Sequence, residues 1–313
     1  MKLSEFEFIS RVASLLSQQG VEVPIGDDAA VVRGEGELLI LTTDALTQGS
    51  HYLKEWKGVV EELYYLLGKK LLNVCASDVA AMGGEPKFGL VTVSLTEESS
   101  DEDAVALFKG LGEEAERLGV KVIGGDTVKG ECELFNMALI GRGEGYMVRS
   151  SARPGELVGV TGSFGDARGG LELLKEGKRE PWSLVEKLLN PKARIEEGIG
   201  ALRAGVECGT DVSDGLLFNL STIAQASRVK IDVESSLIPI SRELIETFGE
   251  RKALEFALYG GEDYELIITF PKELKEKVEE IGFKVIGKVS EGEGVFLDGK
   301  RALIKGFEHF KEE

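Results

Sequence analysis

The sequence is poor in cysteine, histidine and proline. Its 313 residues include three cysteines, two histidines and seven prolines. Cys75, Cys132 and Cys208 lie far apart and form no C-x-x-C pair. This spacing argues against both a disulfide framework and a zinc knuckle.

Positive charge is also scarce. The chain has 37 Lys and Arg residues against 55 Asp and Glu residues, which gives a formal net charge of −18. Nucleic acids and anionic membrane surfaces recruit basic surface, so this balance argues against both as partners. A phosphorylated small molecule remains compatible with it, provided that metal ions lie between the carboxylates and the phosphates.

Long apolar runs are missing, since no run approaches the ~18 residues that span a bilayer. Near the N-terminus, Glu5, Glu7 and Arg11 alternate with apolar residues at helical spacing, which predicts an amphipathic helix rather than a signal peptide. The hydrophobic share of 42% is typical of a soluble globular protein. We therefore predict a cytoplasmic protein.

The residue patterns predict two domains that mix helices and strands. Residues 141–155 are rich in Gly, Ser and charge, so we place the domains at 1–146 and 147–313. In the first half, periodicity predicts strands at 37–44, 87–95, 120–126 and 133–143 and helices at 59–84 and 101–119. The second half alternates helices with strands and closes with a hairpin that turns at Asp298-Gly299.

Acidic residues recur where the chain is otherwise apolar or small. The stretch LTTDALTQGSHY, residues 41–52, follows an apolar run that predicts a buried strand. Asp78 lies late in a predicted helix among apolar and small residues, where an unpaired carboxylate is costly. The full set is Asp27, Asp28, Asp44, Asp78, Asp126, Asp211, Asp214, Glu262 and Asp263.

Each of these carboxylates alone fits a turn or a helix cap, where Asp is common. Together, at the ends of apolar strands, they are expected to converge in one crevice and to repel one another. Mg²⁺ would relieve this repulsion, because it takes oxygen ligands from a few carboxylates, water and phosphate groups. Thr42 and Thr43 would add oxygens beside Asp44, so the sequence predicts a metal site.

Glycine pairs at positions 83, 124, 169 and 260 suit a close approach of backbone to phosphate, although each also fits a turn or a helix end. Residues 161–174, TGSFGDARGGLELL, are the best single candidate for a phosphate loop. The Walker A, protein-kinase, G-x-S-x-G and H-E-x-x-H motifs are all missing. A phosphoryl-transfer enzyme with an uncommon nucleotide site remains.

Seven motifs in this order resemble the thiamine-monophosphate kinase family, which belongs to the superfamily of aminoimidazole ribonucleotide synthetase and selenophosphate synthetase. They are GDDAAV, TTDALTQGSHY, ASDVAAMGGEP, IGGDT, ARPGE, DVSDGL and GGEDYEL. The resemblance extends from Gly26 to Phe310. Its specific part is the combination of TTDALTQGSHY, GGEDYEL and the terminal GFEHF.

The resemblance implies a two-domain α/β (α+β) fold with an aminoimidazole-ribonucleotide-synthetase-like architecture. Its N-terminal domains would pair in a homodimer through a shared β-barrel, and its C-terminal α/β domain would complete the active site. The implied reaction is direct transfer of the γ-phosphoryl group of ATP to thiamine monophosphate, with several Mg²⁺ ions and no phosphoenzyme. Such a transfer depends on positioning and charge neutralisation.

The resemblance also implies roles for individual residues. The implied metal ligands are Asp28, Thr42, Thr43, Asp44, Asp78, Asp126, Asp211 and Asp214. The implied ATP-binding residues are Gly125, Asp126, Arg149 and Ser213, and the residues implied near thiamine are His51, Glu262 and Phe307. Lys109 stands where related sequences often carry an aromatic residue, so contacts to adenine stay unassigned.

Two alternatives remain open. The first is another ATP-dependent enzyme of the superfamily. A selenophosphate synthetase would need a reactive cysteine in a glycine-rich N-terminal segment, whereas Cys75, the first cysteine, lies in a predicted helix. The second is a non-catalytic divalent-metal-binding protein, which would explain the acidic residues but not the glycine-rich loops or Arg149.

Overall fold

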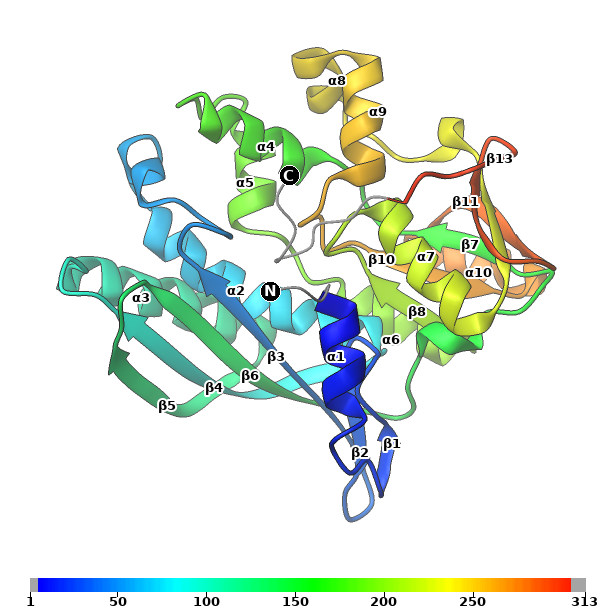
Figure 1. The fold of residues 1–313 in the computed structure, drawn as a ribbon, viewed down its shortest axis with the longest axis horizontal. Coiled ribbons are helices and arrows are strands. Elements are labelled where there is room, and N and C mark those ends of the chain that lie inside the picture. The colour runs from blue at the N-terminus through cyan, green and yellow to red at the C-terminus, as the bar shows by residue number, and fades with distance from the viewer. Residues whose placement is uncertain (1–4, 305–313) are drawn as a thin grey trace.

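Two β-sheets organise residues 5–304, the part of the chain that the computed structural model describes (Figure 1). The first sheet has the strand order β1-β2-β3-β6-β4-β5. Its strands are β1 (Val21–Val23), β2 (Ala30–Arg33), β3 (Leu38–Thr47), β4 (Glu85–Leu95), β5 (Lys121–Lys129) and β6 (Leu134–Gly143). Strands β4 and β5 run parallel, and all other neighbours in this sheet run antiparallel.

The helices of the first half are α1 (Glu5–Ala13), the short 3-10 helix η1 (Lys54–Gly58), α2 (Leu63–Ala81) and α3 (Asp101–Leu118). Helix α3 begins where the Ser100 hydroxyl accepts the Asp103 N–H at 3.1 Å, and it ends at Gly119 with a φ of 68°. Helix α2 is apolar on nearly all sides and is correspondingly buried. It packs against β3 and β6 on one face of the sheet and against α3. The predicted helices and strands of this half are thus confirmed.

The second sheet has the order β13-β12-β9-β11-β7-β10-β8, and only β9 and β12 pair in parallel. Its strands are β7 (Leu157–Val160), β8 (Cys208–Asp211), β9 (Lys230–Val233), β10 (Leu266–Phe270), β11 (Lys284–Ser290), β12 (Gly294–Leu297) and β13 (Lys300–Arg301). The predicted closing hairpin is β12–β13, which turns through Asp298 and Gly299, both with positive φ.

The second half of the chain also contains several helices. They are α4 (Asp166–Lys175), α5 (Trp182–Leu189), α6 (Ile195–Ala204), α7 (Leu216–Ser227), α8 (Arg242–Phe248), α9 (Glu250–Tyr259) and α10 (Lys275–Ile281), with 3-10 turns η2 (Arg149–Ser151), η3 (Ser235–Leu237) and η4 (Lys272–Leu274). Of these, α7 packs on β8, β9 and β12. Helices α8 and α9 were missing from the predicted elements. The sequence signal for α8 is Ser241, whose hydroxyl accepts the Leu244 N–H at 3.1 Å.

The end of α2 enters the core of the second half. Ala80 and Ala81, at the end of α2, share one buried apolar cluster with Met147 and with Leu266 and Ile268 of β10. Helix α2 therefore lies between the two sheets and contacts both β3 and β8. Because the cores on either side are continuous, the domain boundary near Tyr146 stays a prediction.

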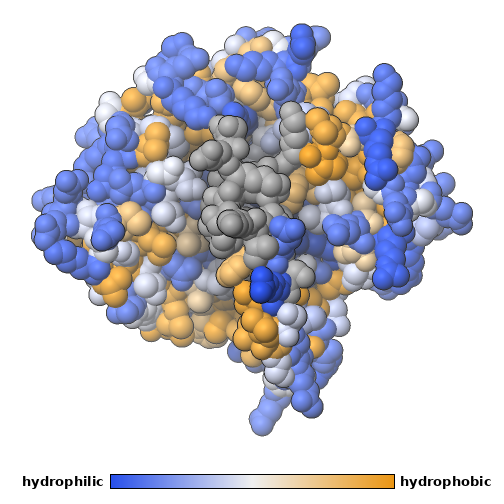
Figure 2. Space-filling view, in the orientation of Figure 1, coloured by the Kyte–Doolittle hydropathy of each residue, from blue (hydrophilic) through white to orange (hydrophobic). Residues whose placement is uncertain are grey.

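The first sheet is open within the described chain, and its edge strands are β1 and β5. Helices α2 and α3 cover one face. Strand β5 is exposed along its whole length, and apolar side chains gather where β4, β5 and α3 reach the surface (Figure 2). Residues 5–304 form no closed barrel, and none of their helices combines the length and apolarity needed to cross a bilayer.

Candidate active site

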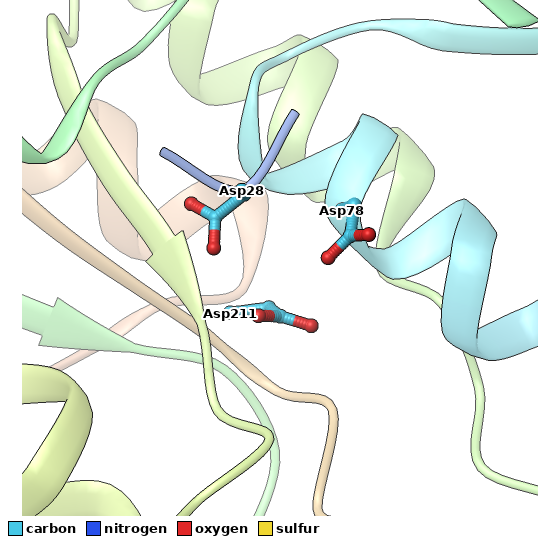
Figure 3. A group of neighbouring side chains, drawn as sticks. All are labelled: Asp28, Asp78 and Asp211. Atoms are coloured by element: carbon cyan, nitrogen blue, oxygen red, sulfur yellow. The ribbon is translucent and has the colours of Figure 1, made fainter. Parts of the chain in front are cut away.

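Three aspartates from three separate elements meet between the two sheets. Asp28 lies in the loop between β1 and β2, Asp78 lies in the last turn of α2, and Asp211 ends β8. One carboxylate oxygen from each lies within 4.8 Å of the others. Figure 3 shows the three carboxyl groups turned toward a common space. We call Asp28, Asp78 and Asp211 the acidic cluster; its convergence was expected from the sequence.

Neighbouring donors orient each carboxylate of the acidic cluster. The Thr42 hydroxyl donates to Asp78 Oδ2, and the Ser77 hydroxyl donates to Asp211 Oδ2 at 2.6 Å. Asp28 Oδ1 accepts a hydrogen bond from the Thr210 hydroxyl at 2.9 Å and another from the Arg149 guanidinium. Asp28 Oδ2 is buried and has no hydrogen-bond partner among the described residues.

Burial and mutual repulsion raise the pKa values of Asp44, Asp78 and Asp211. Burial, and then the charges of Glu262 and Asp214, raise the pKa of Asp44 to about 7. Burial, and then the charge of Asp28, raise the pKa of Asp211 to about 8. The pKa of Asp78 rises well above its usual range through burial and the charges of Asp44 and Asp211. The ionised cluster therefore needs a compensating cation.

The donor set fits Mg²⁺. The side chains offer carboxylate and hydroxyl oxygens, which are the ligands that hard divalent cations take. The unpartnered Asp28 Oδ2 and the raised pKa values of Asp44 and Asp211 both indicate that a positive charge would stabilise the site. No other ligand type is present in the acidic cluster.

Asp44 adjoins the cluster but not in the predicted way. Strand β3 runs on to Thr47, so Asp44 lies inside the strand rather than at its end. Its side chain shares a face with Thr42 and is hydrogen-bonded to Asp78. Thr43 points to the opposite face, where its hydroxyl accepts the Asn136 amide at 2.9 Å. The structure therefore brings Thr42 and Asp44 to the cluster, but not the Thr43 side chain.

Ser213 and Asp214 follow β8 directly and lie near the cluster. The Ser213 hydroxyl donates to Asp214 Oδ2 at 3.2 Å, and the Asp214 N–H donates to Asn219 Oδ1 at 3.2 Å. Asp214 is close enough to Asp44 to raise the pKa of that carboxyl group. Both residues therefore border the same site from the second half of the chain.

Arg149 is the cation that contacts the acidic cluster. Its guanidinium donates to Asp28 Oδ1 and, at 3.1 Å, to the Thr210 hydroxyl, while its backbone N–H donates to Asp27 Oδ2 at 3.1 Å. The charges of Asp28 and Asp27 raise the pKa of Arg149 despite its burial. In this structure Arg149 therefore balances the charge of Asp28 at the edge of the site.

Gly125 and Asp126 lie away from the cluster within one chain. Asp44 pairs across the sheet with Met137, Met137 with Val91, and Val91 with Gly125. Three strand spacings of about 4.8 Å put β5 about 14 Å from β3. Asp126 is exposed and lies in the interior of β5 rather than at its end, and its side chain is on the face opposite to Asp44.

His51 lies in a turn that a buried carboxylate fixes. His51 Nδ1 accepts the Thr47 N–H at 3.1 Å. Beside this turn, Glu133 Oε2 accepts the hydroxyls of Tyr52 and Tyr64, each at 2.8 Å. These hydrogen bonds help to hold the pKa of Glu133 below its usual value despite burial. The turn that carries His51 is therefore fixed by its own hydrogen bond and by the Tyr52–Glu133 contact next to it.

Two further predictions concern the thiamine side and the phosphate loop. Phe307 lies outside the described residues. In the candidate loop at 161–174, the Gly165 N–H donates to both oxygens of the buried Asp263, at 3.1 and 2.9 Å. This N–H is therefore already occupied, and a phosphate role for the loop stays a prediction.

Sequence reasoning missed three residues that hold the site. Ser77 and Thr210 orient Asp211 and Asp28. Lys70 is completely buried on α2 and pairs with Glu262. The available signal for Lys70 was a charged residue at the start of the apolar run LLNVCA, two helical turns before Asp78.

Comparisons with known proteins agree with this architecture. Residues 26–143 match the family model "AIR synthase related protein, N-terminal domain", and residues 153–300 match "AIR synthase related protein, C-terminal domain". The fold and the acidic cluster between its two halves thus define an AIR synthase related protein.

Relatives that match over their full length show which AIR synthase related family the chain belongs to. The thiamine-monophosphate kinase of Aquifex aeolicus (strain VF5) is 36% identical, with 99% of each chain covered. That of Haemophilus influenzae is 34% identical, with 100% of this chain and 99% of the relative covered. A solved structure described as "AaThiL complexed with AMPPCP and TMP" matches with a TM-score of 0.90 at 36% identity over 99% of each chain. The chain belongs to the thiamine-monophosphate kinase family.

Proposed function

We propose that the chain is a thiamine-monophosphate kinase, which transfers the γ-phosphoryl group of ATP to thiamine monophosphate and forms thiamine diphosphate and ADP. The observation that carries this proposal is the acidic cluster, with its unpartnered Asp28 oxygen, in a chain that matches AaThiL with AMPPCP and TMP over its full length. A phosphate that attacks another phosphate is an encounter of two anions. Clustered carboxylates suit it only when cations are present.

In this proposal Mg²⁺ would be held by the acidic cluster together with Thr42, Asp44 and Asp214. The family resemblance adds Thr43 and Asp126 as further ligands. Bound Mg²⁺ supplies positive charge that offsets the repulsion between the donor and acceptor phosphates. The chain contributes fixed geometry. Thr42 and Ser77 orient the carboxylates of Asp78 and Asp211, and the Arg149 guanidinium offsets the charge of Asp28.

We assign the substrates to two sides of the cluster. Gly125, Asp126, Arg149 and Ser213 are proposed for ATP. Gly125 suits this role because a Cβ there would collide with the Val91 carbonyl, so no side chain covers the backbone. His51 and Glu262, with Phe307, are proposed for thiamine monophosphate, because the Glu262 carboxylate suits the cationic thiazolium ring.

We further propose a cytoplasmic homodimer in which the first sheets of two copies form a shared barrel. Support comes from β5, which is exposed and, within residues 5–304, is an edge strand with one side unpaired. Val122, Ile123 and Val128 of β5 are exposed, at 38%, 60% and 43%, and Leu90 of the neighbouring strand β4 is 45% exposed. An apolar edge of this kind is expected to be covered by a partner.

An assay of the purified chain with ATP, thiamine monophosphate and Mg²⁺ tests the function. We expect thiamine diphosphate and ADP in equal amounts, with no product in excess EDTA. ADP without thiamine diphosphate would favour another ATP-dependent enzyme of the family. A rise in melting temperature with Mg²⁺ but no turnover would favour a non-catalytic metal-binding protein.

A further inference from the structure

Lys70 has no access to solvent, although it carries a charge. Its side chain is 0% exposed on α2, and its ammonium group donates to Glu262 Oε2. Taking an ammonium group out of water is costly unless it is paired and hydrogen-bonded. Glu262 belongs to the second half of the chain and is 24% exposed, so the pair joins the two halves next to the site.

Glu262 lies in a backbone segment that is under strain. Its φ is 70°, and Tyr264, two residues further on, has a φ of 50°. Such angles cost free energy for residues other than glycine and persist only when surrounding contacts impose them. The Glu262 N–H donates to the Ser213 carbonyl at 2.7 Å, and the Tyr264 N–H donates to the Val212 carbonyl at 2.9 Å.

The backbone contacts fix the path of this segment, whereas Lys70 fixes the direction of the Glu262 side chain. The other carboxylate oxygen, Oε1, lies 3.4 Å from the Tyr264 hydroxyl. Glu262 also borders the site, because its N–H donates to the carbonyl of Ser213, two residues after Asp211. Lys70 and Asp78 stand two turns apart on α2, about 12 Å along the axis. One rigid helix thus holds both an acidic-cluster ligand and the cation that directs Glu262.

We propose that Lys70 is a positioning residue for the acceptor side of the reaction. It contacts no substrate, since it is completely buried, and acts through Glu262 by holding that carboxylate toward the cationic ring of the acceptor. This inference rests on the proposed function and deepens it. A purely structural role would instead stabilise the fold without distinguishing the two substrates.

Steady-state kinetics of Lys70→Met separates these roles. Methionine keeps the length and apolar stem of the side chain and removes the charge. We expect the KM for thiamine monophosphate to rise tenfold or more, while the KM for ATP changes by less than about twofold. Lys69→Met is the matched control. Lys69 is the adjacent residue on α2, 15% exposed, and pairs with Glu113 on α3 at 2.8 Å, away from the acidic cluster.

A second variant keeps the test decisive if Lys70→Met folds poorly. Lys70→Met with Glu262→Gln removes both charges, so no buried charge is left unpaired. We expect this double variant to recover most of the melting temperature but not the KM for thiamine monophosphate. Recovery of both would show that the pair only stabilises the fold, and an equal rise in both KM values would also overturn the proposal. Failure of the wild type to turn over would refute the proposed function instead.

Discussion

Each carboxyl group at the site is held by a nearby donor and opposed by its acidic neighbours. Ser77 donates to Asp211 and Thr42 donates to Asp78, which favours the ionised forms. Burial and the surrounding negative charge favour the protonated forms more strongly, and the pKa values of Asp44 and Asp211 rise to about 7 and about 8. Without a bound metal, Asp44 and Asp211 therefore titrate in the neutral range.

This titration predicts how the stability of the metal-free protein depends on pH. In the unfolded chain Asp44 and Asp211 ionise near their ordinary value of 3.8, so between pH 4 and pH 8 the folded state binds more protons. The free energy of unfolding must then fall as pH rises from about 4, and level off once pH passes about 7 and 8. We expect the melting temperature in EDTA to drop by a few degrees between pH 6 and pH 8, a loss on the order of 1–3 kcal/mol.

The same pH series in excess Mg²⁺ is the control for this prediction. A bound cation removes the cost of ionising the cluster, so the melting temperature should vary much less with pH. A melting temperature in EDTA that rises from pH 6 to pH 8 would contradict the raised pKa values.

At the scale of helices, α2 and α3 meet through two glycines. A Cβ on Gly68 would collide with the Leu107 carbonyl, and a Cβ on Gly110 would collide with the Tyr65 carbonyl. The two backbones therefore approach more closely than any side chain would permit. This contact sets how far α3 stands from the helix that carries Asp78.

We expect Gly68→Ala to destabilise the protein by about 1–3 kcal/mol, because the helices must separate to admit the methyl group. Gly112→Ala on α3 is the matched control, since nothing lies within 4 Å of a Cβ there. That substitution should stabilise the protein by up to about 1 kcal/mol through helix propensity. Denaturant unfolding of both variants measures the difference, and equal effects would mean that the close approach is unimportant.

The helices and strands could be predicted from the sequence more readily than the way in which they pack together. Periodicity and capping residues predict α2, α3 and β3 because these signals are local. The strand order β3-β6-β4-β5 is not local, and it alone puts Asp126 three strands from Asp44. Apolar surroundings predicted that Asp78 needs partners, but the pairing of Lys70 with Glu262 depends on how the two halves dock.

At the scale of the whole molecule, the exposed edge at β5 predicts a dimer that one substitution should disrupt. Ile123 is 60% exposed on β5, and an aspartate there would place charge in the proposed shared barrel. We expect Ile123→Asp to sediment as a monomer at micromolar concentration while the wild type sediments as a dimer. Leu237→Asp, at a 44% exposed position in the second half, is the control and should remain dimeric. A monomeric wild type would refute the dimer.

The position of α2 also determines where the chain can be cut. A fragment that ends near Tyr146 would keep α2 but leave Ala80 and Ala81 without their partners on β10. The complementary fragment would lose those two alanines from its own core and would leave Glu262 without Lys70. We therefore expect that neither fragment would fold as it does in the whole chain. An insertion, deletion or domain exchange at the 146 boundary would have to carry the last turns of α2 with the second half.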